Sequence, residues 1–279
     1  MKIIAEVGAN HRGFINIAKQ MIDTLSDYCG VDSVKFQKRN NRELLGKDYD
    51  KPHPNPENSY GNTYGEHRDS LEFNLEQHKE LKEYCENKGL IYSCSVWDLT
   101  STKEIVSLNP VMIKIPSAQN NNFEILEYLM SNYPGEIHIS LGMTTYEEIE
   151  NIYQFAKMRN RNKDLVFYIC TSGYPVLNDD ICIREVEKLK KYDIKGFGFS
   201  GHHTNIAVDN MTVAYGFDYI ERHFTINKNW KGTDHPASLE PKEMRSLVKN
   251  IKQCVSANKF KSKEILDCEL RQRNKLKYK

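Results

Sequence analysis

The sequence predicts a single (β/α)8 barrel. Eight short apolar runs recur along the chain, each is followed by an amphipathic stretch, and 279 residues suffice for one such barrel. A doubly wound open sheet is the alternative architecture. It needs fewer strands and usually begins with a glycine-rich phosphate loop, which this sequence lacks. The barrel is therefore the favoured fold.

The eight apolar runs are the expected strands. Near-continuous runs of β-branched and aromatic residues are typical of strands that are covered on both faces. These runs lie at residues 3–7, 33–37, 90–95, 112–116, 137–141, 165–170, 196–200 and 219–224.

Helical patterns lie between the expected strands. Residues 73–89 carry apolar side chains at helical spacing and end at Gly89. Residues 121–135 start with Asn and end in Pro-Gly, and residues 144–158 open with Thr followed by early glutamates. These are helix start and stop signals, and the glutamates also complement the helix dipole.

The expected domain organisation is one barrel over residues 1–258 and a basic tail over 259–279. Residues 39–72 form a long segment rich in Asn, Gly, Pro and charge after the second strand. Loops of this length are usually lids or disordered, and this one follows a strand on the face where barrels build active sites. The tail is expected to form a short helix with a frayed end.

The composition excludes several function classes. Lys and Arg number 39 against 38 Asp and Glu, so the formal charge is +1, which argues against a nucleic-acid or anionic-membrane binder. No apolar run approaches about 18 residues, and the N-terminal run is too short for a signal peptide. Seven scattered cysteines without a CxxC pair are typical of reduced thiols, so we expect a cytoplasmic protein.

Polar side chains interrupt the expected strands near their C-terminal ends. Because these ends meet at the mouth of a closed barrel, the side chains are expected to converge there. Independent structural ion pairs are the simpler alternative, since a buried charge is costly unless it is paired. The residues are Glu6, Lys35, Gln37, Ser95, Lys114, Ser117, Ser140, Ser172, Ser200, His202, Glu221 and His223.

The residue types at the mouth suggest their chemistry. Two lysines with several serine hydroxyls suit an anion, either a phosphate or a carboxylate. His202 and His223 could share a divalent metal, although His203 directly follows His202 and two histidines alone are a weak metal signal. Glu6 and Asp234 could bind sugar hydroxyls or transfer protons.

Six motifs in order carry a family resemblance: AEVGANHRG, VKFQ, KIPSAQ, SLGM, SGHHTN and ERHFTINKNWKGTDHPASLEP. Through them the chain resembles the sialic acid synthase (N-acetylneuraminate synthase) family over residues 2–255. The resemblance implies a (β/α)8 barrel that condenses phosphoenolpyruvate with an open-chain aldose, typically N-acetylmannosamine or a related sugar, and releases phosphate. It also implies a divalent metal cofactor, Mn2+ or Mg2+, and small molecules as the partners.

The resemblance also implies residue roles. Phosphoenolpyruvate would bind Lys35, Ser95, Lys114, Ser117, Ser140, Ser172 and Ser200, and the sugar would bind Glu6, Gln37, Trp97, Tyr174 and Asp234. The metal would bind His202 and His223. The catalytic positions would be Glu6, Lys114, Gln119 and Asp234. Ser95, Trp97 and Ser172 stand where family members usually have threonine, phenylalanine and asparagine.

Departures from the family pattern put the acceptor sugar in doubt. Gln119 stands in place of a glutamate and cannot transfer a proton, and Gly201 replaces the usual aspartate. KIPSA replaces the usual glycine-rich KIGSG. The chain ends near where most members continue into a small antifreeze-like domain, which supplies an arginine to the partner subunit's site. Segment 39–72 is expected to substitute as a lid through Arg39, Arg42, Glu66, His67 and Arg68, and a homodimer is a further expectation.

Two other functions stay open from the sequence. A lysine on a barrel strand, Lys35 or Lys114, is also compatible with a Schiff-base aldolase. The alternative that is not an enzyme is a barrel that binds a sugar or a phosphate without catalysis. Gln119 in place of glutamate and the expected lack of the antifreeze-like domain prompt this alternative.

Overall fold

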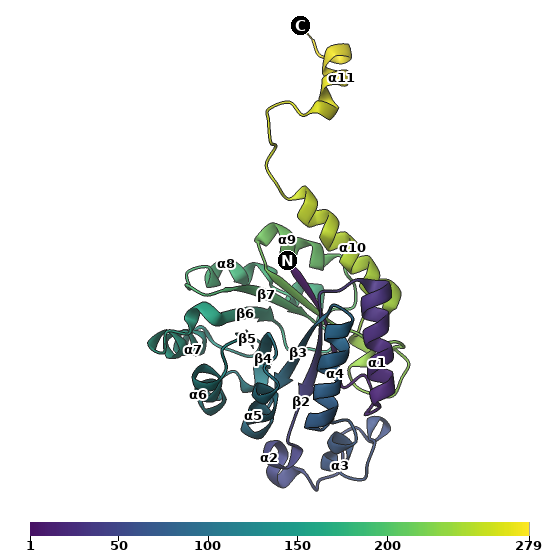
Figure 1. Cartoon of the computed structure of the whole chain (residues 1–279), viewed down its shortest axis with the longest axis vertical. Helices are drawn as coiled ribbons and strands as arrows, with labels where there is room; N and C mark the ends of the chain where they lie inside the picture. The colour runs from purple at the N-terminus through teal and green to yellow at the C-terminus, as the bar shows by residue number, and fades with distance from the viewer. Residues whose placement is uncertain (279) are drawn as a thin grey trace.

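The computed structural model describes residues 1–278 and contains a closed barrel of eight parallel strands in sequential order (Figure 1). This confirms the predicted fold class, and each strand lies within a residue or two of its predicted run. The strands are β1 (Lys2–Gly8), β2 (Ser33–Lys38), β3 (Ile91–Val96), β4 (Met112–Ile115), β5 (Glu136–Ser140), β6 (Leu165–Cys170), β7 (Gly196–Gly201) and β8 (Tyr219–His223).

Helices surround the barrel (Figure 1). The three predicted helices are present, and Asn74, Asn122 and Thr145 cap their first turns by accepting backbone N–H bonds. The surrounding helices are α1 (Ile15–Asp23), α4 (Leu75–Asn87), α5 (Leu99–Ser107), α6 (Phe123–Asn132), α7 (Tyr146–Met158), α8 (Val186–Leu189), α9 (Met211–Tyr215) and α10 (Pro241–Ala257).

The long segment 39–72 is folded rather than disordered. It contains α2 (Asn41–Leu45) and α3 (Tyr64–Asp69). Asp69 accepts hydrogen bonds from the Asn41 amide, at 2.8 Å, and from the Tyr49 hydroxyl. The Tyr49 ring leaves no room for a side chain on Gly65, since a Cβ there would lie 2.4 Å from it. Contacts between residues far apart within the segment therefore hold α2 and α3 together.

Beyond α10 the chain leaves the barrel and ends in α11 (Asp267–Leu276), which stands apart from the other helices (Figure 1). Phe260 in the connecting segment is almost fully exposed. Lys279, the last residue of the predicted tail, lies outside the described residues. Within residues 1–278 no helix combines the length and the apolar character that crossing a bilayer requires.

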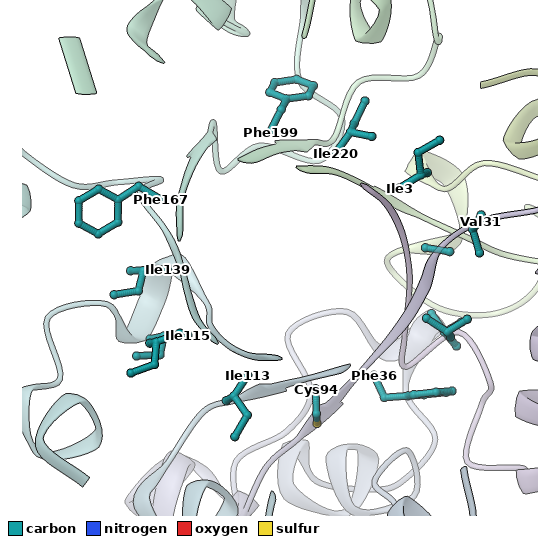
Figure 2. Packing of buried hydrophobic residues seen from close by; sticks show 14 of the residues in the cluster. Ile3, Val31, Phe36, Cys94, Ile113, Ile115, Ile139, Phe167, Phe199 and Ile220 are labelled. Carbon is teal, nitrogen blue, oxygen red and sulfur yellow. The ribbon is translucent and has the colours of Figure 1, made fainter. Parts of the chain in front are cut away.

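Side chains alternate between the two faces of the barrel strands. The outward ones are apolar and pack under the helices, as Phe36, Ile113, Ile139, Phe167 and Ile220 show (Figure 2). The inward positions are unusually polar, because β1, β2, β4 and β8 each carry one buried charged side chain toward the mouth. Because successive side chains of a strand point to opposite faces, the apolar residues pack against the helices while the polar residues between them face the cavity.

Polar groups also fill the middle of the barrel. The His138 ring lies between the Tyr168 hydroxyl, 2.8 Å from its Nδ1, and the Glu136 carboxylate, 3.0 Å from its Nε2. The Tyr219 hydroxyl donates to the same carboxylate at 2.8 Å. Gly198 makes room for the Tyr168 ring, since a Cβ there would lie 2.3 Å from it. This hydrogen-bonded layer closes the barrel beneath the mouth.

Arg222 is the one charged side chain of β8 that points outward, and it is fully buried. Its guanidinium group donates to the carboxylate of Asp209, to the Asn205 carbonyl at 3.0 Å, and to the His203 carbonyl. These acceptors all lie between β7 and α9. Arg222 therefore fastens the loop that follows β7 to the neighbouring strand.

Replacing Asp209 by alanine should lower the free energy of unfolding by about 3–5 kcal/mol, because it leaves the Arg222 charge buried without its counter-ion. Urea denaturation followed by circular dichroism measures this loss. Asp267→Ala is the control, since that carboxylate lies on the exposed face of α11 and its removal should cost less than about 0.5 kcal/mol. A loss below about 1 kcal/mol for Asp209→Ala would contradict a stabilising role for this ion pair.

Candidate active site

A cavity of about 410 Å³ opens at the C-terminal ends of the barrel strands. With one exception, every site residue predicted from the sequence lines it. These residues are Glu6, Lys35, Gln37, Ser95, Trp97, Lys114, Ser117, Ser140, Ser172, Tyr174, Ser200, His202, His223 and Asp234. The convergence of strand ends explains how residues more than 200 positions apart in sequence share one cavity.

Four buried charges form the floor of the cavity. Lys35 Nζ lies 2.5 Å from a Glu6 oxygen and 3.6 Å from a Glu221 oxygen. Lys114 Nζ lies 2.7 Å from that Glu221 oxygen. We call Glu6, Lys35, Lys114 and Glu221 the ion cluster. Its two ammonium and two carboxylate groups balance, which is the condition under which buried charges are tolerated.

Burial and the neighbouring charges set the protonation of the ion cluster. Burial raises the pKa of Glu6 to about 7 although Lys35 acts against it. Burial also acts to raise the pKa of Glu221, but Lys114 and Lys35 outweigh it and hold that pKa well below its usual range. Burial lowers the pKa of Lys114, and Glu221 offsets part of that effect. Glu6 is therefore the member of the cluster that changes protonation most readily near neutral pH.

Serine hydroxyls surround the two lysines. Lys35 donates to Ser95 Oγ at 2.5 Å, and Ser200 Oγ donates to Glu221 at 3.1 Å. The backbone N–H of Gly142 donates to Ser117 Oγ at 3.1 Å. A Cβ on Gly142 would lie only 2.4 Å from Ser172 Oγ, so this glycine lets the loop after β5 approach the serines. Hydroxyl donors next to two ammonium groups form a polar surface suited to an anion.

His202 and His223 lie side by side in the cavity wall, with ring centroids 5.3 Å apart. His202 Nδ1 lies 3.1 Å from the Thr171 carbonyl, so it carries the proton and leaves Nε2 as the free acceptor. Burial, together with His223, lowers the pKa of His202 to about 3, and burial lowers the pKa of His223 as well. Both rings are therefore neutral at pH 7.

The structure separates His202 from its neighbour His203. His203 lies behind the cavity wall, where its Nε2 is 3.2 Å from Asp209 and 3.1 Å from Arg222. His223 Nδ1 is buried and has no hydrogen-bond partner. Within residues 1–278 no three His, Cys, Asp or Glu side chains are placed to hold a metal ion together. Any ion at the histidine pair would have to complete its coordination with water or substrate.

Aromatic side chains form the upper walls. The Tyr174 ring packs against His202, with centroids 4.3 Å apart. The Trp97 ring stacks against the Arg39 guanidinium at 4.3 Å. Asp234 approaches from the loop after β8, and although burial acts to raise its pKa, His223 and the hydrogen bond from Thr233 hold that pKa below its usual value. The walls thus offer ring faces and a carboxylate, which suit a sugar.

Gln119 is the one predicted catalytic residue that the structure does not place in the cavity lining. The reason is that the chain turns away from the mouth in the short helix Ser117–Gln119. Its side-chain oxygen accepts from the Asn122 amide at 3.1 Å, and Asn122 in turn caps α6. Gln119 thus supports the start of a helix.

Of the five residues named for the predicted lid in segment 39–72, two line the cavity. Arg39 and Arg68 line the cavity, but Arg42, Glu66 and His67 do not. Arg42 lies over the Tyr49 ring, and Glu66 caps α3 together with Thr63. Glu221, in contrast, has no role predicted from the sequence, although it contacts both lysines. Its position two residues before His223, on the same strand face, is the signal that could have assigned it.

Several known proteins are similar to this chain over most of its length. The NeuB family model matches residues 21–263. The mouse N-acetylneuraminate-9-phosphate synthase is 38% identical over 98% of this chain and 76% of its own length. The N,N'-diacetyllegionaminic acid synthase of Campylobacter jejuni is 31% identical over 91% of this chain and 76% of its own.

A solved structure shows the same barrel. The crystal structure of the N-acetylneuraminic acid (sialic acid) synthetase from Leptospira borgpetersenii, in complex with citrate, superposes with a TM-score of 0.83 at 26% identity. The superposition covers 100% of this chain and 93% of the other. From the match over most of its length and from relatives above 30% identity, the chain belongs to the NeuB family.

Proposed function

We propose that this protein condenses phosphoenolpyruvate with an open-chain aldose to form a sialic-acid-like 3-deoxy-2-ulosonic acid, with release of phosphate. One observation carries the proposal: a lysine and serine surface for an anion and a pair of neutral histidines line the same cavity. Relatives that make N-acetylneuraminate 9-phosphate and N,N'-diacetyllegionaminic acid support it.

The floor of the cavity suits phosphoenolpyruvate. Lys35 and Lys114 can donate to its phosphate and carboxylate, and the nearby serine hydroxyls add neutral donors. Both ammonium groups are buried, so their interaction with these anionic groups is little screened by water. The same groups stabilise the negative charge of the phosphate as it leaves.

His202 and His223 are the residues that would hold a divalent ion. Their rings are neutral, the tautomer of His202 frees its Nε2, and His223 Nδ1 is buried without a partner. Two imidazole nitrogens suit Mn2+ better than Mg2+, which prefers oxygen ligands. When bound, the ion would supply Lewis-acid polarisation of the aldehyde oxygen of the sugar.

The proposed reaction joins two carbons and breaks one carbon–oxygen bond. The methylene carbon of phosphoenolpyruvate attacks the aldehyde carbon, the aldehyde oxygen takes up a proton, and an oxocarbenium forms at C2 of the pyruvyl unit. Water adds at C2 and loses a proton. The resulting hemiketal phosphate collapses to the ketone as its C2–O bond to phosphate breaks.

Side chains above the floor would orient the sugar and move protons. Asp234 and Tyr174 would contact the sugar, and Gln37 and Trp97 lie on the same wall. Glu6 is suited to exchange a proton near neutral pH because burial raises its pKa to about 7. No proton transfer is assigned to Gln119, which lies outside the cavity lining.

The direct test is phosphate release from phosphoenolpyruvate in the presence of Mn2+ and a panel of aldoses that includes N-acetylmannosamine. We expect release that depends on one sugar and falls at least about 100-fold in His223→Ala, because the histidine pair is then incomplete. Asp267→Ala, which alters only exposed α11, should retain full activity. Phosphoenolpyruvate binding without release for any sugar would instead indicate a binding protein.

A Schiff-base aldolase is the alternative enzyme, favoured by one observation: burial lowers the pKa of Lys114. The contact with Glu221 at 2.7 Å argues against it, since it holds Lys114 as an ammonium group. We expect that pyruvate and borohydride leave the intact mass of the protein unchanged. A reduced adduct that disappears in Lys114→Ala would establish the aldolase.

A further inference from the structure

A second group of donors lines the cavity in addition to the ion cluster. Arg39 and Arg68 come from segment 39–72, and Trp97 follows β3. We call these three residues the arginine rim. Its side chains line the same cavity as the floor but take no part in the ion cluster.

Arg39 is held rigidly and still has unused donor capacity. Its side chain is 9% exposed, and it donates to Gln37 Oε1 at 2.7 Å. Glu72 is its counter-ion, with 3.6 Å between Nη1 and the carboxylate oxygen. Arg39 Nε and Trp97 Nε1 are both buried and have no hydrogen-bond partner. These two stacked side chains therefore each present a buried N–H group that lacks a hydrogen-bond acceptor.

Arg68 supplies a charge that has no direct ion-pair partner, although it acts at longer range on the Asp234 and Glu72 carboxylates. It is half-buried on α3 and donates to the Tyr64 hydroxyl at 2.5 Å. Within residues 1–278 no carboxylate lies within 4.0 Å of its guanidinium nitrogens. Arg39 and Arg68 line the same cavity, where burial and the charge of Arg68 lower the pKa of Arg39 to about 10 although Glu72 and Asp234 act to raise it. An anion between the two guanidinium groups would relieve their repulsion.

We infer that the arginine rim binds a phosphate group on the acceptor sugar, so that the preferred acceptor is a phosphorylated open-chain aldose. The inference rests on the proposed function and specifies its substrate class. Every unmet group of the rim is a donor, which matches the acceptor-only chemistry of phosphate, and arginine binds phosphate in a bidentate way. The two lysines of the floor already serve phosphoenolpyruvate.

The numbering of the product agrees with this assignment. Phosphoenolpyruvate contributes three carbons, so C6 of the aldose becomes C9 of the product. A relative named for a 9-phosphate product therefore corresponds to an acceptor with its phosphate on C6, at the end distant from the reacting aldehyde. The rim likewise makes no ion pair with the floor, where the new bond would form.

Kinetics with N-acetylmannosamine and its 6-phosphate test the inference. We expect the wild type to have the higher kcat/KM for the 6-phosphate, and Arg68→Ala to lower the ratio of the two values roughly 10- to 100-fold. Arg68→Lys keeps the positive charge but loses the bidentate hydrogen-bonding geometry of the guanidinium group. Its ratio of the two kcat/KM values should therefore lie between those of the wild type and Arg68→Ala. Arg42→Ala is the matched control, because this exposed arginine of the same segment stacks on Tyr49 and does not line the cavity.

Calorimetry with the reduced sugar separates this inference from the proposed function. N-acetylmannosaminitol 6-phosphate has no aldehyde and cannot react, so its binding does not depend on turnover. We expect it to bind the wild type and Arg42→Ala at least about 10-fold more tightly than the unphosphorylated alditol, and Arg68→Ala to lose this preference. Equal affinity for the two alditols in the wild type would overturn the inference, whether or not phosphate is released from phosphoenolpyruvate.

Discussion

The balanced cluster of two lysines and two glutamates in the barrel mouth is the constraint on which the rest of this structure depends. Charges on β1, β2, β4 and β8 are tolerated there only because Glu6, Lys35, Lys114 and Glu221 lie within contact distance of one another. That arrangement requires a closed barrel with the observed register, in which Glu6 lies opposite Lys35 and also opposite His223. The apolar outer faces supply the stability that allows such a polar interior.

The histidine pair depends on neighbouring elements in a similar way. The Thr171 carbonyl after β6 orients the His202 ring, and Arg222 on β8 fastens the loop that carries it. The outward face of β8 thus holds the loop while its inward face presents Glu221 and His223. β8 therefore contributes one histidine of the pair and also the anchor for the loop that carries the other, which limits how far either can be changed alone.

Strand periodicity made most of the architecture predictable from sequence. Apolar runs located all eight strands, and polar residues near their ends identified most of the cavity lining. The same rule would have assigned Glu221 from His223, because residues two apart share a strand face. This strand-face rule fails beyond the end of β4. There the turn at Gln119 and the cap by Asn122 decide which way the side chains point. Segment 39–72 was unpredictable in detail, since contacts such as Tyr49 with Asp69 join residues with no periodic relation.

The neutrality of the ion cluster has a thermodynamic consequence. Glu6 and Glu221 already compensate the lysine charges, so an arriving anion would leave the buried floor with excess negative charge. Uptake of the anion must therefore be accompanied by positive charge. A proton on Glu6 can provide it, because the pKa of that carboxyl is about 7, and a cation held by His202 and His223 would provide more. By reciprocity, the anion would strengthen the affinity of the floor for whichever positive charge enters with it.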